Sequence, residues 1–195
     1  DEETIASGSK AAVKGGYTAV ACTANTNPII DNAYLIEFIL KQAQASGYAK
    51  VYPIGAITKG LQGMELAEMG EMVAAGAVAF SDDGQTLMNP AVLRSALEYS
   101  TLFKLPLLLH QEDPNLAGSG VMHEGYWSTV LGLQGIPAPA EAVVIARDLL
   151  LAETTQAKVH FCHVSTADGV ALIKAAKERG VKVTAEATPH HLCLS

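Results

Sequence analysis

Three side chains that can bind a metal follow three apolar segments of the sequence. Asp83 ends the run of residues 77–83, His110 follows residues 105–109, and His163 follows residues 158–162. Because short apolar runs of this kind are typical of buried strands, we expect all three side chains at the carboxyl ends of strands. One carboxylate and two imidazoles suit Zn²⁺ with an open position for water, whose pKa zinc would lower toward neutrality. The sequence therefore predicts a metal-dependent hydrolytic site.

Strand periodicity selects Asp83 rather than Asp82 as the site carboxylate. In an extended segment Asp83 shares a face with Ser81, whereas Asp82 shares the other face with Phe80. We expect Asp83 to point toward the site, with His110 on the face of Leu108. An Asp-Asp-Gly sequence after a strand is also typical of an ordinary turn, so the assignment depends on the two histidines.

Other polar residues have a structural interpretation as well as a functional one. His163 would share a strand face with Phe161, so His160 should lie on the opposite face and pack under a helix. His123 lies in a glycine-rich segment and is expected to be solvated, although a loop over a site could use it. Asn25 could serve turn chemistry or bind a ligand through its amide. The pair after the last predicted strand could form a site wall or be structural: His190 and His191.

The elements that must position these residues form six strand-plus-loop units that alternate with helices. Apolar, β-rich runs predict strands at residues 17–23, 51–57, 77–83, 105–109, 158–162 and 181–187. Helical patterns occupy residues 1–14, 31–46 (with Asp31 as the N-cap), 64–75, 90–103, 141–153 and 167–179. Residues 114–139 form a long segment with no clear period, which predicts a functional or mobile loop.

Strands that are apolar on both faces and separated by helices indicate a parallel sheet covered on both sides. An open doubly wound sheet and a TIM barrel both fit this pattern. No Gly-x-Gly-x-x-Gly fingerprint and no Walker sequence occurs, which disfavours a nucleotide-binding open sheet. Polar residues at the ends of several different strands are typical of a barrel, so we predict an α/β barrel.

Composition excludes several classes of partner. The 195 residues are 49% hydrophobic and 17% charged, with a formal net charge of -7 and no Lys/Arg cluster. This balance argues against nucleic acid or an anionic membrane as partner, and no apolar run is long enough to span a bilayer. The three cysteines have no paired spacing and the first residues do not form a signal peptide, so we expect a cytoplasmic protein.

Seven motifs occur in order along the chain. They are Gly15-Gly16-Tyr17-Thr18-Ala19-Val20, Asn25-Thr26-Asn27-Pro28, Phe80-Ser81-Asp82-Asp83-Gly84, His110-Gln111-Glu112-Asp113, Leu131-Gly132-Leu133-Gln134-Gly135-Ile136-Pro137, Phe161-Cys162-His163-Val164-Ser165-Thr166 and Thr184-Ala185-Glu186-Ala187-Thr188-Pro189-His190-His191-Leu192. With these motifs the chain resembles a bacterial class I dihydroorotase of the amidohydrolase superfamily.

This resemblance implies a metal-dependent (β/α)₈ barrel, usually with zinc, that interconverts N-carbamoyl-L-aspartate and L-dihydroorotate in de novo pyrimidine biosynthesis. Asp83 matches the carboxylate that bridges two metals in the family. His110 and His163 match ligands of the second metal, and Asn25 matches a residue that holds the substrate carboxylate.

The resemblance also implies that parts of the barrel are missing from these residues. The family's His-x-His pair belongs to the first strand and its catalytic acid/base Asp to the eighth, so residues 1–195 are expected to be the central part of one barrel domain, with strands two to seven. Such a piece would hold at most one of the family's two zinc ions well and would be inactive alone. The alternative is a non-catalytic dihydroorotase-like subunit that scaffolds aspartate transcarbamoylase; a homo-oligomer is also possible.

Overall fold

The computed structural model describes residues 3–194, in two compact units that comprise Asp1–Gln85 and Thr86–Ser195. In each unit, parallel strands alternate with helices, which confirms the predicted α/β class. Within residues 3–194, every helix is too short or too polar to cross a bilayer. The assignment of all residues to one barrel domain stays a prediction.

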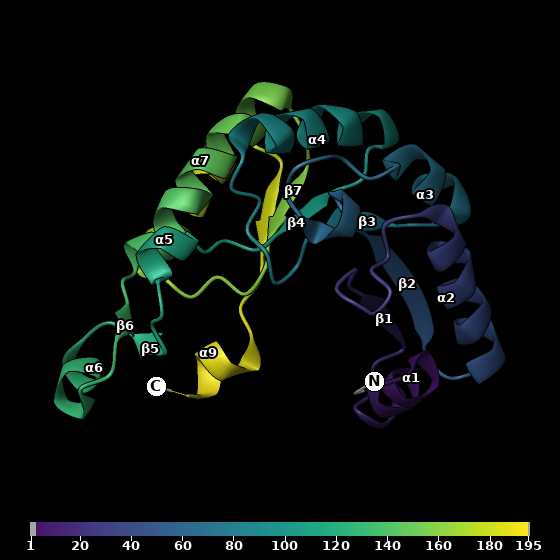
Figure 1. Cartoon of the computed structure of the whole chain (residues 1–195), viewed down its shortest axis with the longest axis horizontal. Helices are drawn as coiled ribbons and strands as arrows, with labels where there is room; N and C mark the ends of the chain where they lie inside the picture. Colours follow the sequence, from purple (N-terminus) through teal and green to yellow (C-terminus); the bar gives the residue numbers. More distant parts are fainter. Residues whose placement is uncertain (1–2, 195) are drawn as a thin grey trace. The chain divides into compact units, whose positions relative to one another are not determined.

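The first unit is built on three parallel strands in the order β1-β2-β3. Helix α2 packs against α1, α3 and β2 (Figure 1). The elements are α1 (Ile5–Lys14), β1 (Ala19–Cys22), α2 (Ala33–Ser46), β2 (Lys50–Gly55), the 3₁₀ turn η1 (Lys59–Leu61), α3 (Met69–Ala75) and β3 (Ala79–Ser81).

Local signals explain where α2 begins and ends. Its amphipathic pattern buries Ile36 and Ile39, and Gly47 ends the helix in the left-handed conformation that a glycine adopts without steric cost. The N-cap is Asn32, whose Oδ1 accepts a hydrogen bond from the Leu35 amide at 3.2 Å. The prediction of Asp31 as the cap is wrong, because its carboxylate instead accepts a hydrogen bond from the Gly60 amide at 3.1 Å.

Within residues 86–194, the main sheet of the second unit has three parallel strands in the order β4-β7-β8. Helix α7 packs against both α4 and α8 (Figure 1), and the buried side chains beneath these helices include Leu93, Leu107, Ile145 and Phe161. The elements are α4 (Pro90–Phe103), β4 (Leu107–Leu109), α7 (Pro139–Thr155), β7 (Val159–Phe161), α8 (Ala167–Glu178) and β8 (Val183–Ala185).

The segment at 114–139 has regular structure, so the prediction of a long loop is wrong. It contains α5 (Pro114–Ala117), β5 (Met122–His123), α6 (Tyr126–Leu131) and β6 (Gly135–Ile136), and β5 pairs with β6 in a separate parallel ribbon. These strands have two residues each, which is too short for a periodic sequence pattern. A further short helix, α9 (Pro189–Cys193), follows β8, with the Thr188 hydroxyl as its N-cap.

Candidate active site

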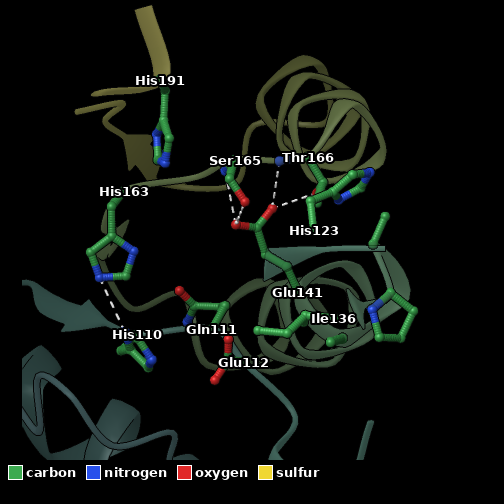
Figure 2. Close-up of a pocket in the computed structure, with 13 residues that line it drawn as sticks. His110, Gln111, Glu112, His123, Ile136, Glu141, His163, Ser165, Thr166 and His191 are labelled. Atoms are coloured by element: carbon green, nitrogen blue, oxygen red, sulfur yellow. Dashed lines mark hydrogen bonds between the residues drawn. The ribbon is translucent and has the colours of Figure 1, made fainter. Parts of the chain in front are cut away.

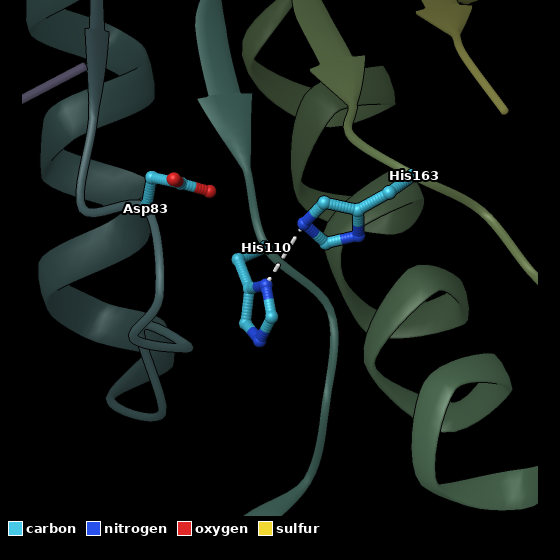
Figure 3. A group of neighbouring side chains, drawn as sticks. All are labelled: Asp83, His110 and His163. Carbon is cyan, nitrogen blue, oxygen red and sulfur yellow. Dashed lines mark hydrogen bonds between the residues drawn. The ribbon is translucent and has the colours of Figure 1, made fainter. Parts of the chain in front are cut away.

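The pairing of β4 with β7 brings His110 and His163 together. Leu108 lies opposite His160 in the parallel register, so the chain leaves both strands at the same edge of the sheet. Nδ1 of His110 lies 3.1 Å from Nε2 of His163, and the two rings meet edge to face (Figure 3). The structure thus brings the two imidazoles of the predicted site into direct contact through their ring nitrogens.

His163 occupies an unusual backbone conformation. Its φ of 39° lies in the left-handed region that only a few per cent of non-glycine residues adopt. Such strain in a residue beside a pocket is typical of functional positions. It also ends the alternation of the strand, so parity cannot determine the direction of the His163 side chain.

The segment that follows His163 is held by Glu141 on α7. The Glu141 carboxylate accepts hydrogen bonds from the amides of Ser165 and Thr166, each at 2.8 Å, and from both of their hydroxyl groups (Figure 2). The Thr166 hydroxyl oxygen in turn caps α8 by accepting from the Gly169 amide. Glu141 thus fixes the chain two residues beyond His163.

Thr86 holds the equivalent segment beyond His110. Its hydroxyl oxygen accepts a hydrogen bond from the Glu112 amide at 2.9 Å and lies within donating distance of the His110 and Glu112 carbonyl oxygens. Both histidines are therefore positioned by hydrogen bonds to the main chain immediately after them.

A cavity of about 280 Å³ lies beside the two histidines. Polar side chains from the strand ends, from α7 and α9 and from the 114–139 segment surround it (Figure 2). Its lining comprises His110, Gln111, Glu112, His123, Ile136, Pro137, Ala138, Ala140, Glu141, His163, Ser165, Thr166 and His191. This volume matches the lower end of the range for small-molecule sites.

One buried polar atom in the lining has no partner within residues 3–194. Gln111 is 6% exposed, its Nε2 donates to Asp148 at 3.3 Å, and its Oε1 accepts no hydrogen bond from the described residues. Burial raises the pKa of the Asp148 carboxyl, although the neighbouring Arg147 guanidinium and Gln111 act in the opposite direction. A buried acceptor at a cavity wall is suited to a donor group on a ligand.

In the first unit, Asp82 and Asp83 have different environments. Asp82 is 4% exposed, and its carboxylate accepts hydrogen bonds from the Ile57 amide, the Thr58 amide and the Thr58 hydroxyl. Burial raises the pKa of Asp82, and these hydrogen bonds partly oppose the shift. Asp83 is half-buried and accepts a hydrogen bond from Nδ2 of Asn25 at 3.4 Å. These contacts give Asp82 a structural role, which agrees with its exclusion as the site carboxylate. The assignment of Asp83 to the metal site stays a prediction.

The predicted position of His160 is wrong. Its side chain is not packed under a helix: Nδ1 lies 2.8 Å from the Thr184 hydroxyl and Nε2 lies 3.4 Å from the Glu186 carboxylate. The core positions of β7 are instead Val159 and Phe161, which are 2% and 0% exposed. The error came from extending strand parity to His163 through the left-handed turn.

Sequence reasoning missed several residues at the cavity. Glu141 bonds to residues 24 and 25 positions away, and Gln111 to one 37 positions away, so no local pattern marks either of them. His123, on β5, is exposed as expected but also lines the cavity, as does His191 on α9. His190 does not line the cavity.

Solved structures show the fold to which these elements belong. The chain resembles the L-hydantoinase (dihydropyrimidinase) of Arthrobacter aurescens with a TM-score of 0.74 and 21% identity, over 96% of this chain and 43% of that one. It resembles the D-hydantoinase (dihydropyrimidinase) of a Thermus species with a TM-score of 0.76 and 22% identity, over 99% of this chain and 43% of that one. This likeness confirms the predicted fold, part of a (β/α)₈ barrel.

Sequence relatives define the family. A protein named dihydroorotase from Pelotomaculum thermopropionicum is 57% identical over 99% of this chain and 45% of its own length. A dihydroorotase from Ruminiclostridium cellulolyticum is 51% identical over the whole chain and 45% of its own length. The chain thus spans about half the length of these curated relatives. The family model described as dihydro-orotase-like matches residues 1–169. The chain therefore belongs to the dihydro-orotase-like family.

Proposed function

We propose that the full-length protein is a zinc-dependent dihydroorotase that reversibly converts N-carbamoyl-L-aspartate to L-dihydroorotate. The relatives that are 57% and 51% identical carry that name, and the family match covers residues 1–169. The observation that carries the metal proposal is the approach of Nδ1 of His110 to Nε2 of His163.

The geometry of the histidine pair fits one shared metal ion. Two nitrogens on a tetrahedral zinc lie roughly 3.3–3.5 Å apart, since each Zn–N bond is about 2.0–2.1 Å long. The two ring nitrogens lie 3.1 Å apart, so only a small adjustment is needed for both to bind one ion. The main-chain anchors at Thr86 and Glu141 would keep both rings in place, as partners beyond the ligands do in metal sites.

We assign Asp83 as the carboxylate ligand that accompanies His110 and His163. The donor chemistry fits zinc, which accepts nitrogen and carboxylate ligands together. Asp82 is unsuitable because its carboxylate is already occupied by three hydrogen bonds from Ile57 and Thr58. Asn25 donates to Asp83 and is assigned to the substrate carboxylate.

The proposed chemistry divides between the metal and the chain. A bound zinc ion would activate water and polarise the ring amide carbonyl. Gln111 presents an acceptor at the cavity wall, and His123 and His191 offer further polar contacts to a substrate. The acid/base Asp that moves the proton lies outside residues 1–195 in this proposal, so these residues alone should lack activity, since loss of such a group costs about 10²- to 10⁴-fold.

We place the full-length protein in the cytoplasm, in de novo pyrimidine biosynthesis. Its proposed partner is either a second copy of itself or an aspartate transcarbamoylase. Size-exclusion chromatography with light scattering, with and without the transcarbamoylase, would test the two partners. A non-catalytic scaffold would form the complex yet show no hydrolysis.

Hydrolysis of L-dihydroorotate by the full-length protein, followed by chromatography, tests the activity. We expect turnover in the parent protein, and at least a 10²-fold loss together with lost zinc in His110→Asn and Asp83→Asn. His190→Asn, which changes a histidine outside the cavity, should retain activity. Dihydrouracil and hydantoin, which lack the carboxylate of dihydroorotate, should be poor substrates. Normal activity in His110→Asn would contradict the proposal.

A further inference from the structure

A second group of metal-binding side chains lies across β7 and β8, which run side by side in Figure 1. His160 lies opposite Thr184 and Phe161 opposite Ala185 in the parallel register. The alternation of each strand therefore places His160 and Cys162 on one face of β7, next to Thr184 and Glu186. We call His160, Cys162 and Glu186 the β7–β8 cluster.

The donor atoms of this cluster are an imidazole nitrogen, a sulfur and a carboxylate oxygen. All three lie within 4.8 Å of one another, and Nε2 of His160 lies 3.4 Å from Oε2 of Glu186. Ligand atoms on tetrahedral zinc are separated by roughly 3.3–3.8 Å, given Zn–N and Zn–S bonds of about 2.0 and 2.3 Å. The nitrogen and the oxygen already have this separation. The sulfur, which lies within 4.8 Å of both, would need to move by about 1.3 Å at most.

Thr184 orients the imidazole for metal binding. Its hydroxyl oxygen lies 2.8 Å from Nδ1 of His160, so an Nδ1–H that donates to it leaves the Nε2 lone pair directed toward Glu186. Histidine ligands almost always donate their second ring N–H to a neighbouring acceptor in this way. The cluster thus contains three ligands and the partner that fixes the tautomer of one of them.

The charges of the cluster also favour a divalent ion. A thiolate and a carboxylate carry two negative charges, which a divalent cation neutralises while the imidazole stays neutral. The combination of thiolate and imidazole is typical of zinc sites, whereas magnesium and calcium prefer oxygen ligands. Within residues 3–194, Glu186 is exposed and His160 is half-buried.

We propose that His160, Cys162 and Glu186 bind a zinc ion that links β7 to β8, with the fourth position open to water. This site shares no ligand with the one assigned to His110, His163 and Asp83, so the two proposals do not depend on each other. A metal that binds only the folded state stabilises it by an amount that grows with the logarithm of the ratio of free metal concentration to its dissociation constant. It would therefore hold β8 and the segment that leads from it to α9.

Cobalt substitution of the full-length protein tests this site. A Co²⁺ ion bound by a thiolate gives a charge-transfer band in the near ultraviolet, whereas a site of nitrogen and oxygen ligands does not. We expect the parent protein to show the band and Cys162→Ser to lose it, with one metal equivalent fewer by elemental analysis. Cys22→Ser and Cys193→Ser are matched controls that should keep both.

Two further variants separate ligand loss from misfolding and from the catalytic site. Thr184→Val keeps all three ligands but removes the hydroxyl that orients His160. The affinity of this variant for Co²⁺ should fall about 10- to 100-fold, and the band should return at high cobalt concentration. His110→Asn should keep the band even though it loses a metal from the catalytic site. If Cys162→Ser keeps the band and the full metal content while its circular dichroism is unchanged, the proposal is wrong. If the band behaves as expected but His110→Asn loses no metal, the catalytic proposal fails and this one stands.

Discussion

The carboxylate of Glu141 accepts two hydrogen bonds from Ser165, one from its amide at 2.8 Å and one from its hydroxyl at 2.9 Å. It accepts two more from Thr166, so one side chain of α7 satisfies four donors in the turn between His163 and α8. The position of a candidate metal ligand therefore depends on a residue of another element, whose own carboxylate is occupied by these four donors.

Replacement of this carboxylate should loosen the turn. In Glu141→Gln the amide nitrogen faces donors, and we expect the free energy of unfolding to fall by about 1.5–3 kcal/mol, the range for hydrogen bonds to charged groups. Metal affinity should fall as well, because His163 loses its support. Urea unfolding of the apoprotein and zinc titration measure the two effects.

Glu153→Gln is the matched control for this prediction. Glu153 lies on the same helix and pairs with Arg179 in an exposed ion pair, which contributes little to stability. We expect no change in metal affinity and little change in unfolding. Equal losses in Glu141→Gln and Glu153→Gln would show that the turn is not held by Glu141.

The left-handed backbone of His163 determines which replacement of its imidazole costs the least stability. Asparagine tolerates this conformation better than alanine does, so the apoprotein of His163→Asn should be more stable than that of His163→Ala, by about 1 kcal/mol. Both variants should lose the catalytic metal. Thermal unfolding in the presence of a chelator and elemental analysis test the two parts, and retained metal in either variant would remove His163 from the ligand set.

The buried carboxyl of Asp148 should make stability depend on pH in a defined direction. Burial raises the pKa of Asp148 in the folded protein above its unfolded value of about 3.9. The folded state therefore binds the proton more tightly, so the stability that this group contributes is fully present below the unfolded pKa and is lost as pH rises through the folded pKa.

Comparison of Asp148→Asn with the parent protein across pH isolates this contribution. The free energy of unfolding of the parent minus that of the variant should decrease as pH rises above the unfolded pKa and stay constant once pH exceeds the folded pKa. Asp168→Asn, at an exposed position on α8, should show no such decrease. A difference that increases with pH would mean that the ion pair with Arg147 outweighs burial.

Gly135 allows the close approach of the two strands in the 114–139 segment. A Cβ atom at this position would lie 2.4 Å from Cα of Glu124, so Gly135→Ala should disrupt the ribbon, with a cost of about 1–3 kcal/mol. We expect the amides of Val121 and Glu124, which donate to the carbonyl oxygens of Gln134 and Ile136, to lose hydrogen-exchange protection.

Gly125→Ala is the control within the same segment, because its added Cβ would meet only ordinary contacts with His123 at 3.7 Å. Protection at Val121 and Glu124 should be unchanged in this variant. If Gly135→Ala also leaves protection unchanged, the close approach of the strands does not maintain the ribbon.

Features encoded within a few residues could be predicted from the sequence. Helix α4 runs over Pro90–Phe103 as expected, because a proline at its first turn and an apolar face are both local signals. Local patterns likewise predicted the alternation of strands with helices and the parallel pairing of the strands. They also predicted the residue types of the candidate site. Asp31 shows the limit of such signals, since a backbone amide 29 positions away binds its carboxylate and the neighbouring Asn32 caps the helix instead.

Only the tertiary structure decided which side chains meet. His110 and His163 are 53 positions apart, and their contact depends on the register of β4 with β7. Because the left-handed turn at His163 ends the strand alternation, the direction of His163 does not reveal the face of His160. His160 lies beside Glu186, on the face opposite the buried Val159 and Phe161. A sequence pattern records which face of one element is apolar, whereas the direction of a side chain beyond a strand end is set by packing and hydrogen bonds from distant segments.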